Sequence, residues 1–245
     1  MTKSSSRRLE KLDSDAPQHD KRSVCIPLSR IQKLIGRRMS LSKKTKPCFY
    51  LEVSADTTDL MEMRHTLKKS LGVKITSNAF YIRALGLAVK EYPLMLGALD
   101  GDNIRIAGSI NVGFAVNAPQ GLVVPVVKNA DQKSLAQIAE LEKVFADNAR
   151  SNKLTLDDIT GETVAISNLG AYGIDSFFGI VPPPATTILA AGNTIKTPVP
   201  RNGQIAIRKI TSMTLAVDSR IVSEFYAARF FSAIIDRLEN PRKLM

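Results

Sequence analysis

Apolar residues recur with two different periods along this chain, and the changes of period divide it into helices and strands. A helical period begins after Ser29, a residue type that suits the cap of a helix. Its apolar positions are Ile31, Leu34, Ile35 and Met39, with basic residues on the opposite face. The same criterion predicts helices over 57–71, 78–92, 134–148 and 225–238. Alternating or short apolar runs predict strands over 48–54, 110–117, 122–127, 163–167 and 186–191, and one long strand or a strand pair over 205–217.

The order of these elements indicates the fold class. Helices and strands are mixed without strict alternation, which favours an α/β fold with a layered mixed sheet over a barrel. Residues 118–121 are typical of a hairpin turn, and the glycines within 168–173 predict a bend. Residues 1–23 lack apolar periodicity and are expected to be a disordered basic and polar arm or linker. Residues 24–245 are expected to form one core domain.

The charge of the chain is concentrated in a short segment. The formal net charge is +11, and residues 25–46 contain seven Lys or Arg and no acid. Because the chain has no Trp and few aromatic residues near this segment, we do not expect nucleic-acid binding. No apolar run approaches the length of a membrane span, and we expect no membrane contact. Cys25 and Cys48 lack metal-ligand spacing and are expected to be reduced.

The sequence contains only two histidines. His19 falls in the predicted arm, and His65 is placed by helical phase at a surface or edge position. The folded part therefore offers no histidine triad, and the sequence contains neither a metal-ligand cluster nor a phosphate-binding glycine loop. We expect no metal site.

Five segments, in unbroken order, carry a family resemblance. They are Pro27–Met39, Gly121–Leu135, Ile166–Gly173, Pro183–Ala190 and Leu238–Pro241. In this order they resemble the catalytic core of dihydrolipoamide acyltransferases, the central components of 2-oxoacid dehydrogenase complexes. The resemblance covers about residues 24–245.

The resemblance implies an architecture and a set of partners. It implies a two-layer fold similar to chloramphenicol acetyltransferase, with a mixed sheet and helices packed on one side, assembled as homotrimers with active sites between subunits. Trimers of this family join into cages of about 24 or 60 chains, or into a mixed core with an active paralogue. Other 2-oxoacid dehydrogenase components are implied as partners. Bacterial cytoplasm is the expected compartment, with the mitochondrial matrix as the alternative.

The resemblance also implies a reaction, in which an acyl group moves between coenzyme A and dihydrolipoamide without a covalently bound cofactor. Coenzyme A or acyl-coenzyme A is therefore the implied ligand. Family members carry the base in a motif read D-H-R-x-x-D-G after the last strand. In this chain Ser219 stands at the histidine position and Ser223 at the second aspartate position, and Glu224 replaces the glycine. Ser167, in the bend, matches the family's oxyanion donor.

The basic first helix has two interpretations. The family's second aspartate is expected to pair with an arginine of this helix, here Arg37 or Arg38. These arginines could equally hold the phosphates of coenzyme A. A simpler interpretation of Ser219 and Ser223 is that both cap the following helix.

A serine hydroxyl without its own base cannot draw a proton from a thiol near neutral pH. We therefore expect a catalytically impaired structural component, similar to protein X of the mitochondrial complex. The alternative is an active acyltransferase with an unidentified base, and a basic nucleic-acid binder is a third hypothesis. At the C-terminus, Leu244 and Met245 are expected to be exposed and to anchor a contact between trimers.

Overall fold

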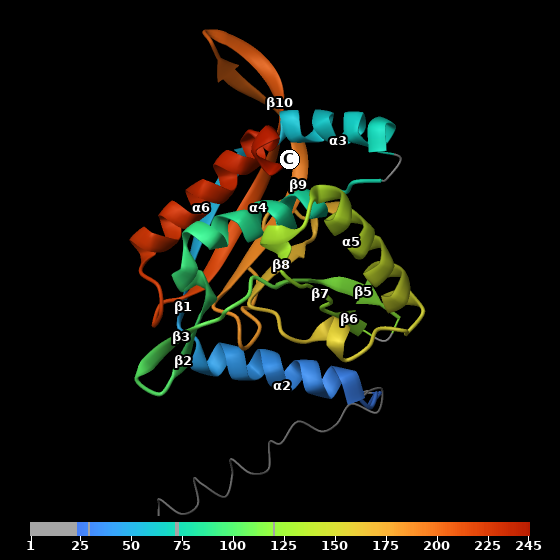
Figure 1. Ribbon diagram of the computed structural model, residues 1–245, viewed down its shortest axis with the longest axis vertical. Helices are drawn as coiled ribbons and strands as arrows, with labels where there is room; N and C mark the ends of the chain where they lie inside the picture. Colours follow the sequence, from blue (N-terminus) through green and yellow to red (C-terminus); the bar gives the residue numbers. More distant parts are fainter. Residues whose placement is uncertain (1–23, 29, 72–73, 120) are drawn as a thin grey trace, which may run out of the picture.

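The computed structural model describes residues 24–28, 30–71, 74–119 and 121–245. A helical layer packs against a mixed sheet, and α2 lies at the opposite end of the molecule from the chain's C-terminus (Figure 1). The helices are α2 (Arg30–Thr45), α3 (Thr58–Leu71), α4 (Ser77–Glu91), α5 (Leu135–Arg150) and α6 (Glu224–Glu239). The predicted helices are confirmed, although Ser29, the predicted cap of the first, lies outside the described residues.

One mixed sheet of six strands organises the domain, in the order β1-β10-β9-β8-β4-β7. Its strands are β1 (Cys48–Asp56), β4 (Val112–Phe114), β7 (Val126–Val127), β8 (Val164–Asn168), β9 (Thr187–Arg201) and β10 (Gln204–Asp218). Strand β8 runs parallel to β4 and β9, and the other neighbouring pairs are antiparallel. Two small hairpins complete the strands, β2 (Gly97–Asp100) with β3 (Asn103–Ile106) and β5 (Val116–Ala118) with β6 (Gly121–Val123).

Two strand predictions differ from the structure. The strand expected over 186–191 continues to Arg201 and pairs with β10 along a ribbon that projects from the sheet (Figure 1). Asn202 and Gly203 close it with positive φ angles of 51° and 77°, as a tight hairpin turn requires. The pair expected over 110–117 and 122–127 is split into four short strands. Pro125, between β6 and β7, has no N–H to donate to the facing strand, which interrupts the pairing there.

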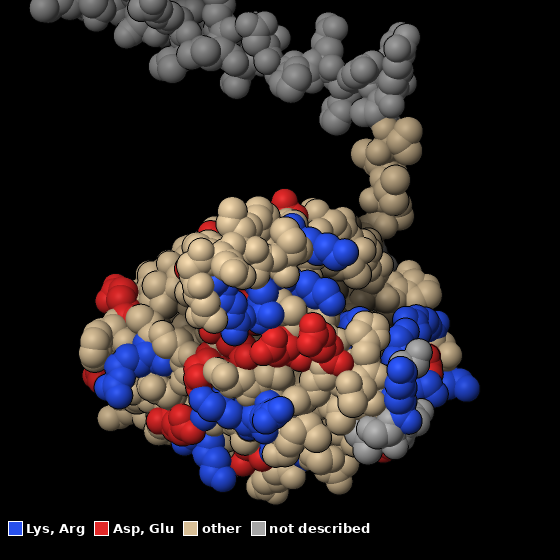
Figure 2. Space-filling model, turned by 90° about the horizontal axis from the view of Figure 1, so that it is seen from above, with Lys and Arg blue, Asp and Glu red and all other residues tan. Residues whose placement is uncertain are grey.

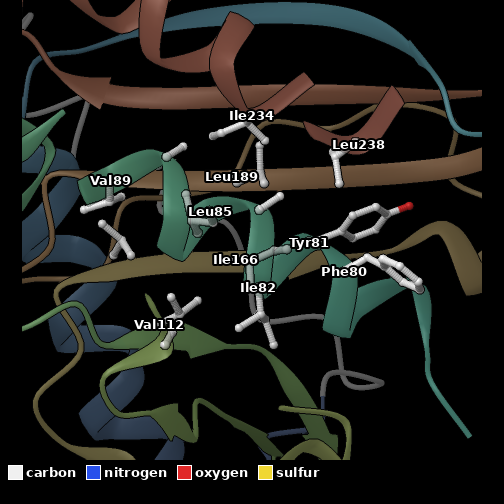
Figure 3. Packing of buried hydrophobic residues seen from close by; sticks show 14 of the residues in the cluster. Phe80, Tyr81, Ile82, Leu85, Val89, Val112, Ile166, Leu189, Ile234 and Leu238 are labelled. Atoms are coloured by element: carbon white, nitrogen blue, oxygen red, sulfur yellow. The ribbon is translucent and has the colours of Figure 1, made fainter. Parts of the chain in front are cut away.

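The main core lies between the helices and one face of the sheet. Helix α4 contributes Phe80, Tyr81 and Ile82 to this core, which also includes Ile166 and Leu189 of the sheet (Figure 3). A second, smaller cluster covers the opposite face and consists of Ala165, Val181, Ala185, Ile188 and Ala216. Consecutive residues of a strand point to opposite faces, so even and odd positions of β8 belong to different clusters. The expected fold, with the helical layer on one side of a mixed sheet, is confirmed.

The end of the chain differs from the prediction. Leu244 is fully buried in the main core of its own chain, whereas 66% of Met245 is exposed. A short 3₁₀ helix, η5 (Pro241–Leu244), turns the chain back after α6 and inserts Leu244 beside α3 and α4. The prediction that Leu244 is exposed for a contact between trimers is therefore wrong.

A capping box fixes the start of α5 and gives a first testable prediction. The Ser134 hydroxyl accepts from the Gln137 N–H at 3.3 Å, and the Gln137 side chain accepts from the Ser134 N–H at 2.8 Å. Replacing Ser134 by alanine is expected to lower the free energy of unfolding by about 1 kcal/mol, measured by urea unfolding. Ser151→Ala, at the other end of α5, is the matched control and should change it by less than about 0.5 kcal/mol. Equal effects would contradict the capping role.

Candidate acyl-transfer site

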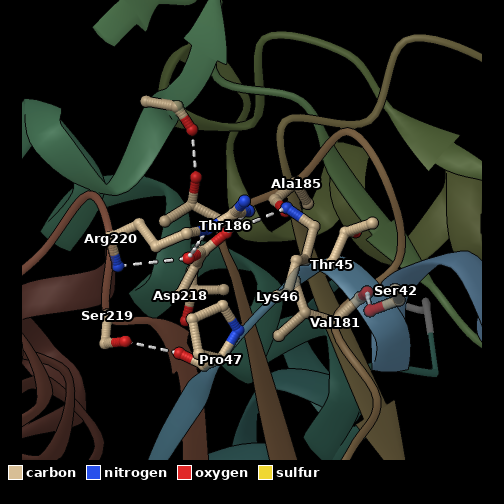
Figure 4. Close-up of polar contacts among 12 residues, drawn as sticks. Ser42, Thr45, Lys46, Pro47, Val181, Ala185, Thr186, Asp218, Ser219 and Arg220 are labelled. Atoms are coloured by element: carbon tan, nitrogen blue, oxygen red, sulfur yellow. Dashed lines mark hydrogen bonds and ion pairs between the residues drawn. The ribbon is translucent and has the colours of Figure 1, made fainter. Parts of the chain in front are cut away.

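The junction between β10 and α6 contains two serines with different roles. Ser223 is the N-cap of α6, and its hydroxyl accepts from the Tyr226 N–H at 3.4 Å. The capping interpretation is confirmed for Ser223. Ser219 is exposed, and its hydroxyl instead donates to the Pro47 carbonyl at 2.5 Å (Figure 4). Since the partner of Ser219 is a carbonyl oxygen, which accepts a hydrogen bond but does not titrate, Ser219 has no base to activate it.

Asp218, directly before Ser219, is the centre of a buried ionic network. Its side chain is 0% exposed and accepts from Arg220 Nε at 2.9 Å and from Arg220 Nη2 at 2.6 Å. Lys46 Nζ lies 3.4 Å from the carboxylate and donates to the Ala185 carbonyl at 2.9 Å (Figure 4). Burial alone would raise the pKa of Asp218, but the hydrogen bonds from Arg220 and the charges of Lys46 and Arg220 bring it below its usual range. The carboxylate is therefore ionised and structural, and sequence reasoning missed its pairing with Lys46.

The two arginines of α2 differ in their surroundings. Arg38 Nη2 lies 2.5 Å from Glu162 Oε1 and donates to the Pro183 carbonyl at 2.6 Å. Glu162 is only 3% exposed, and nothing in the sequence indicated this partner. Arg37 is exposed and makes no ion pair among the described residues. A role of Arg37 or Arg38 in holding phosphates stays a prediction.

Ser167 lies near the end of β8, on the face of the sheet opposite the helical layer. Its neighbour Ala165 belongs to the smaller cluster and Ile166 to the main core, which fixes this orientation. Within the described part of the chain the Ser167 hydroxyl has no hydrogen-bond partner. It is thus free to donate to an oxyanion.

The bend after Ser167 depends on a close approach of two backbones. Asn168 Oδ1 accepts from the Gly170 N–H at 3.0 Å, which turns the chain. A Cβ on Gly170 would lie 2.4 Å from the Gly192 carbonyl oxygen, so only glycine fits there. This contact ties the bend to β9.

The sheet register separates Ser167 from Ser219 within one chain. Ser167 is level with Ala190 of β9, which is level with Thr214 of β10. Ser219 lies five residues further along the chain, about 17 Å along the strand direction, and two strand spacings away, about 10 Å. The two backbones are therefore about 19 Å apart. A single thioester cannot contact both serines of one chain, so a site that uses both positions needs two copies.

A cavity of about 480 Å³ opens beside the bend, on the helical side of the sheet. Its lining includes Arg64 of α3, Ser77 and Asn78 of α4, Glu142 of α5, and Asn168 and Gly170 of the bend. Arg64 is the one Lys or Arg among the described residues of this lining. No pattern in the sequence indicated Arg64 or Glu142 as site residues. Across the described residues, no group of three or more His, Cys, Asp or Glu side chains is arranged to hold a metal ion.

The basic charge is not spread evenly over the surface. A band of acidic side chains crosses the face seen from above, with Lys and Arg on both sides (Figure 2). A groove of about 540 Å³ between α3 and the end of α6 has three acidic residues in its lining, Asp59, Glu62 and Glu239, and one basic residue, Arg242. Within the described ranges, no helix has both the length and the apolar character to cross a membrane.

Comparison with known proteins assigns the domain to a family. Residues 20–245 match the family model described as 2-oxoacid dehydrogenases acyltransferase (catalytic domain). The chain is 35% identical over 223 residues to the dihydrolipoyllysine-residue acetyltransferase component of the pyruvate dehydrogenase complex of Rickettsia bellii, covering 89% of this chain and 53% of that protein. It is 33% identical to the mouse mitochondrial pyruvate dehydrogenase protein X component, covering 89% of this chain and 44% of that one. The chain thus spans about half the length of these relatives.

A solved structure has the same fold. The dihydrolipoamide acetyltransferase of Azotobacter vinelandii superposes with a TM-score of 0.87 at 31% identity, covering 91% of this chain and 93% of that one. That structure comes from crystallographic and enzymatic work on the role of one serine, one histidine and one asparagine in its catalytic mechanism.

Proposed function

Since the chain belongs to the family of 2-oxoacid dehydrogenase acyltransferase catalytic domains, we propose that it is a catalytically impaired core component of such a complex. The observation that carries this proposal is the junction after β10, where Ser219 donates to a carbonyl and has no base beside it. The fold and the free Ser167 hydroxyl are retained. We infer a structural role in assembly, in bacterial cytoplasm or in the mitochondrial matrix, because the relatives include bacterial and mitochondrial proteins.

Residue spacing supports the assignment of the three serines. In the Azotobacter protein the histidine follows the serine by 52 residues, and the asparagine follows the histidine by four. Ser167, Ser219 and Ser223 of this chain have the same two spacings. We therefore assign Ser167 to the retained serine, Ser219 to the histidine position and Ser223 to the position that is asparagine in the Azotobacter protein and aspartate in the family motif.

The chemistry of acyl transfer explains the expected impairment. A thiolate attacks a thioester carbonyl, so the thiol proton must leave and the resulting oxyanion needs a donor. Ser167 supplies the donor, whereas Ser219 supplies no proton acceptor. Loss of a general base costs about 10² to 10⁴ in rate, and the small fraction of thiol already ionised at pH 7 sustains a weak reaction.

We propose that the phosphate-bearing end of coenzyme A, or of its acyl thioester, occupies the cavity beside the bend, on the face of the sheet opposite the Ser167 hydroxyl. The cavity adjoins Asn168, the residue after Ser167, and Arg64 provides a cation for a phosphate group. Arg38 is a weaker candidate because Glu162 and Pro183 already occupy its guanidinium. Coenzyme A here is a substrate or ligand, and no residue of the chain is proposed to hold a cofactor covalently.

The distance between Ser167 and Ser219 within one chain supports assembly into an oligomer. Because both positions belong to one transfer site in the family, the site forms only between copies, as in the homotrimer that we propose. The same surfaces would allow a mixed core with an active paralogue or a closed cage, with other components of the complex as partners. We propose no binding to nucleic acid, since the acidic groove is unsuited to a phosphate backbone.

Two measurements on the unmodified protein test this function. In transfer of acetyl groups from acetyl-coenzyme A to free dihydrolipoamide, we expect turnover at least about 100-fold below that of an active family member. Analytical ultracentrifugation should show trimers or larger assemblies. Turnover within about tenfold of the active enzyme would favour an acyltransferase with another base, and a stable monomer would contradict the assembly role.

A further inference from the structure

Glu142 is a partly buried carboxyl group in the wall of the cavity beside the bend. It lies on α5 and faces the start of α4, where the Thr76 hydroxyl donates to Glu142 Oε2 at 2.5 Å. Asn78 lines the same cavity, and its side-chain amide acts as a donor that lowers the pKa of the Glu142 carboxyl. Within the described residues Glu142 makes no ion pair, although Arg64 lines the same cavity. A buried carboxylate without a cation partner is costly, whereas a neutral carboxylic acid in the same place is not.

Asn78, which lines the cavity with Glu142, has a hydrogen-bond acceptor without a donor. Its carbonyl oxygen Oδ1 is the one buried side-chain polar atom in the described residues without a hydrogen-bond partner. A carboxylic acid and a primary amide pair through two hydrogen bonds, the amide N–H to one carboxyl oxygen and the acid O–H to the amide oxygen. Asn78 acts on the Glu142 carboxyl as a donor that lowers its pKa, which is the direction of the first bond. A proton on Glu142 would form the second and satisfy Asn78 Oδ1, which an ionised carboxylate cannot do.

The surroundings of Glu142 favour this proton. Burial raises the pKa of the Glu142 carboxyl, and the hydrogen bonds from Thr76 and Asn78 offset only part of that effect. The titratable groups that line the cavity with it are Arg64 of α3 and Tyr81 of α4. Burial raises the pKa of Tyr81 as well, so that side chain stays neutral. Arg64 is therefore the cation that an anionic ligand would meet, and Glu142 is the group whose charge can change.

We propose that Glu142 is a specificity-determining residue of this cavity, whose proton completes an acid–amide pair with Asn78 and keeps the wall neutral toward an anionic ligand. The inference rests on the proposed function, in which coenzyme A occupies the cavity. When Glu142 is ionised, its carboxylate repels the phosphates of coenzyme A, and Asn78 Oδ1 loses its donor. Affinity for coenzyme A should then fall by about tenfold.

Calorimetric titration with coenzyme A, from about pH 5 to about pH 8, tests the proposal on the intact protein and two variants. In Glu142→Gln the amide can make both hydrogen bonds to Asn78 and carries no charge at any pH. Glu140→Gln changes an exposed glutamate of the same helix and is the matched control. We expect the affinity of the unmodified protein and of Glu140→Gln to fall about tenfold more with rising pH than that of Glu142→Gln. The phosphate of coenzyme A also titrates, but equally for all three proteins.

Identical pH profiles for the unmodified protein and Glu142→Gln would overturn the proposal, as would failure of Glu142→Gln to match the unmodified protein at low pH. Urea unfolding without ligand provides an independent readout. A raised folded-state pKa favours the fold at low pH, and this stabilisation is lost as the pH rises through that pKa. The stability gained by Glu142→Gln should therefore grow with pH, and a gap that stays constant would refute the acid–amide pair. If no variant binds coenzyme A but the gap grows, the proposed ligand is wrong while the pair stands.

Discussion

Replacing Ser219 by histidine and Ser223 by aspartate together is expected to raise the rate of acetyl transfer to dihydrolipoamide by about 10² to 10⁴. The histidine restores a proton acceptor for the coenzyme A thiol. Ser219 is exposed and its hydroxyl bonds only to the Pro47 carbonyl, so the histidine displaces one hydrogen bond. Aspartate at 223 remains a good cap for α6, since Asp and Ser are equally favoured there. The measurement is steady-state transfer from acetyl-coenzyme A.

A third substitution makes this result specific to the proposed site. Ser167→Ala on the double-variant background should remove about 10² to 10³ of the gain, because the oxyanion loses its donor. Ser109→Ala is the matched control, since Ser109 lies beside the start of β8, at the other end of this strand from Ser167, and its hydroxyl only accepts from Asn111. If the double variant assembles normally but shows no gain, the impairment extends beyond the base.

Replacing Asp218 by alanine is expected to lower the free energy of unfolding by about 3 kcal/mol at neutral pH. The Lys46 side chain is only 9% exposed and would lose its counter-charge, while Arg220, at 36%, can turn toward water. Adding Lys46→Met to Asp218→Ala should recover part of the loss, because the buried cation is then removed as well. Urea unfolding gives the values. Asp147→Ala, which breaks an exposed pair with Arg150, is the surface control, and a loss for Asp218→Ala no larger than for this control would contradict the buried network.

Lowering the pH is expected to weaken the ionic network around Asp218. The pKa of Asp218 is lower in the folded protein than its usual value, so its contribution is present above that usual value, about 3.9, and is lost as the pH falls through the folded value. The unmodified protein should therefore lose stability below about pH 4 more steeply than Asp218→Ala. Parallel pH profiles would show that Asp218 is not linked to folding.

Local patterns in the sequence predicted the helices well. The apolar period locates α4 and α6, and Ser134 is a capping residue that one sequence reveals without a partner elsewhere in the chain. Strands that depend on distant pairing were harder to predict. The outer half of β9 contains two prolines and exposed residues, and only its register with β10 makes it a strand. The same limit applies to Leu244, which is buried by a turn of the chain that its neighbours in sequence do not indicate.

The candidate site also combines features that the sequence indicates with features that only the folded structure shows. Ser219 and Ser223 stand at motif positions, so the missing base could be inferred from the order of residues. The partners of this region come from far away in the chain, with Glu162 lying 124 residues after Arg38 and Asp218 lying 172 residues after Lys46. A single sequence contains no signal for such ion pairs. Glu142 is similar, since a glutamate in an amphipathic helix is normally exposed and only the packing of α4 against α5 buries it.

The distance of about 19 Å between Ser167 and Ser219 has a consequence for mixed assemblies. Each transfer site would take its serine half from one copy and its junction half from a neighbour. In a trimer with two copies of an active paralogue, this chain would leave one interface without a base, yet would still lend its own Ser167 to a neighbour's histidine. Adding this chain would therefore lower the transfer activity of the assembly in proportion to its share, without inhibiting the sites formed by active copies. The expression ratio of the two chains would then set the transfer rate of the whole assembly.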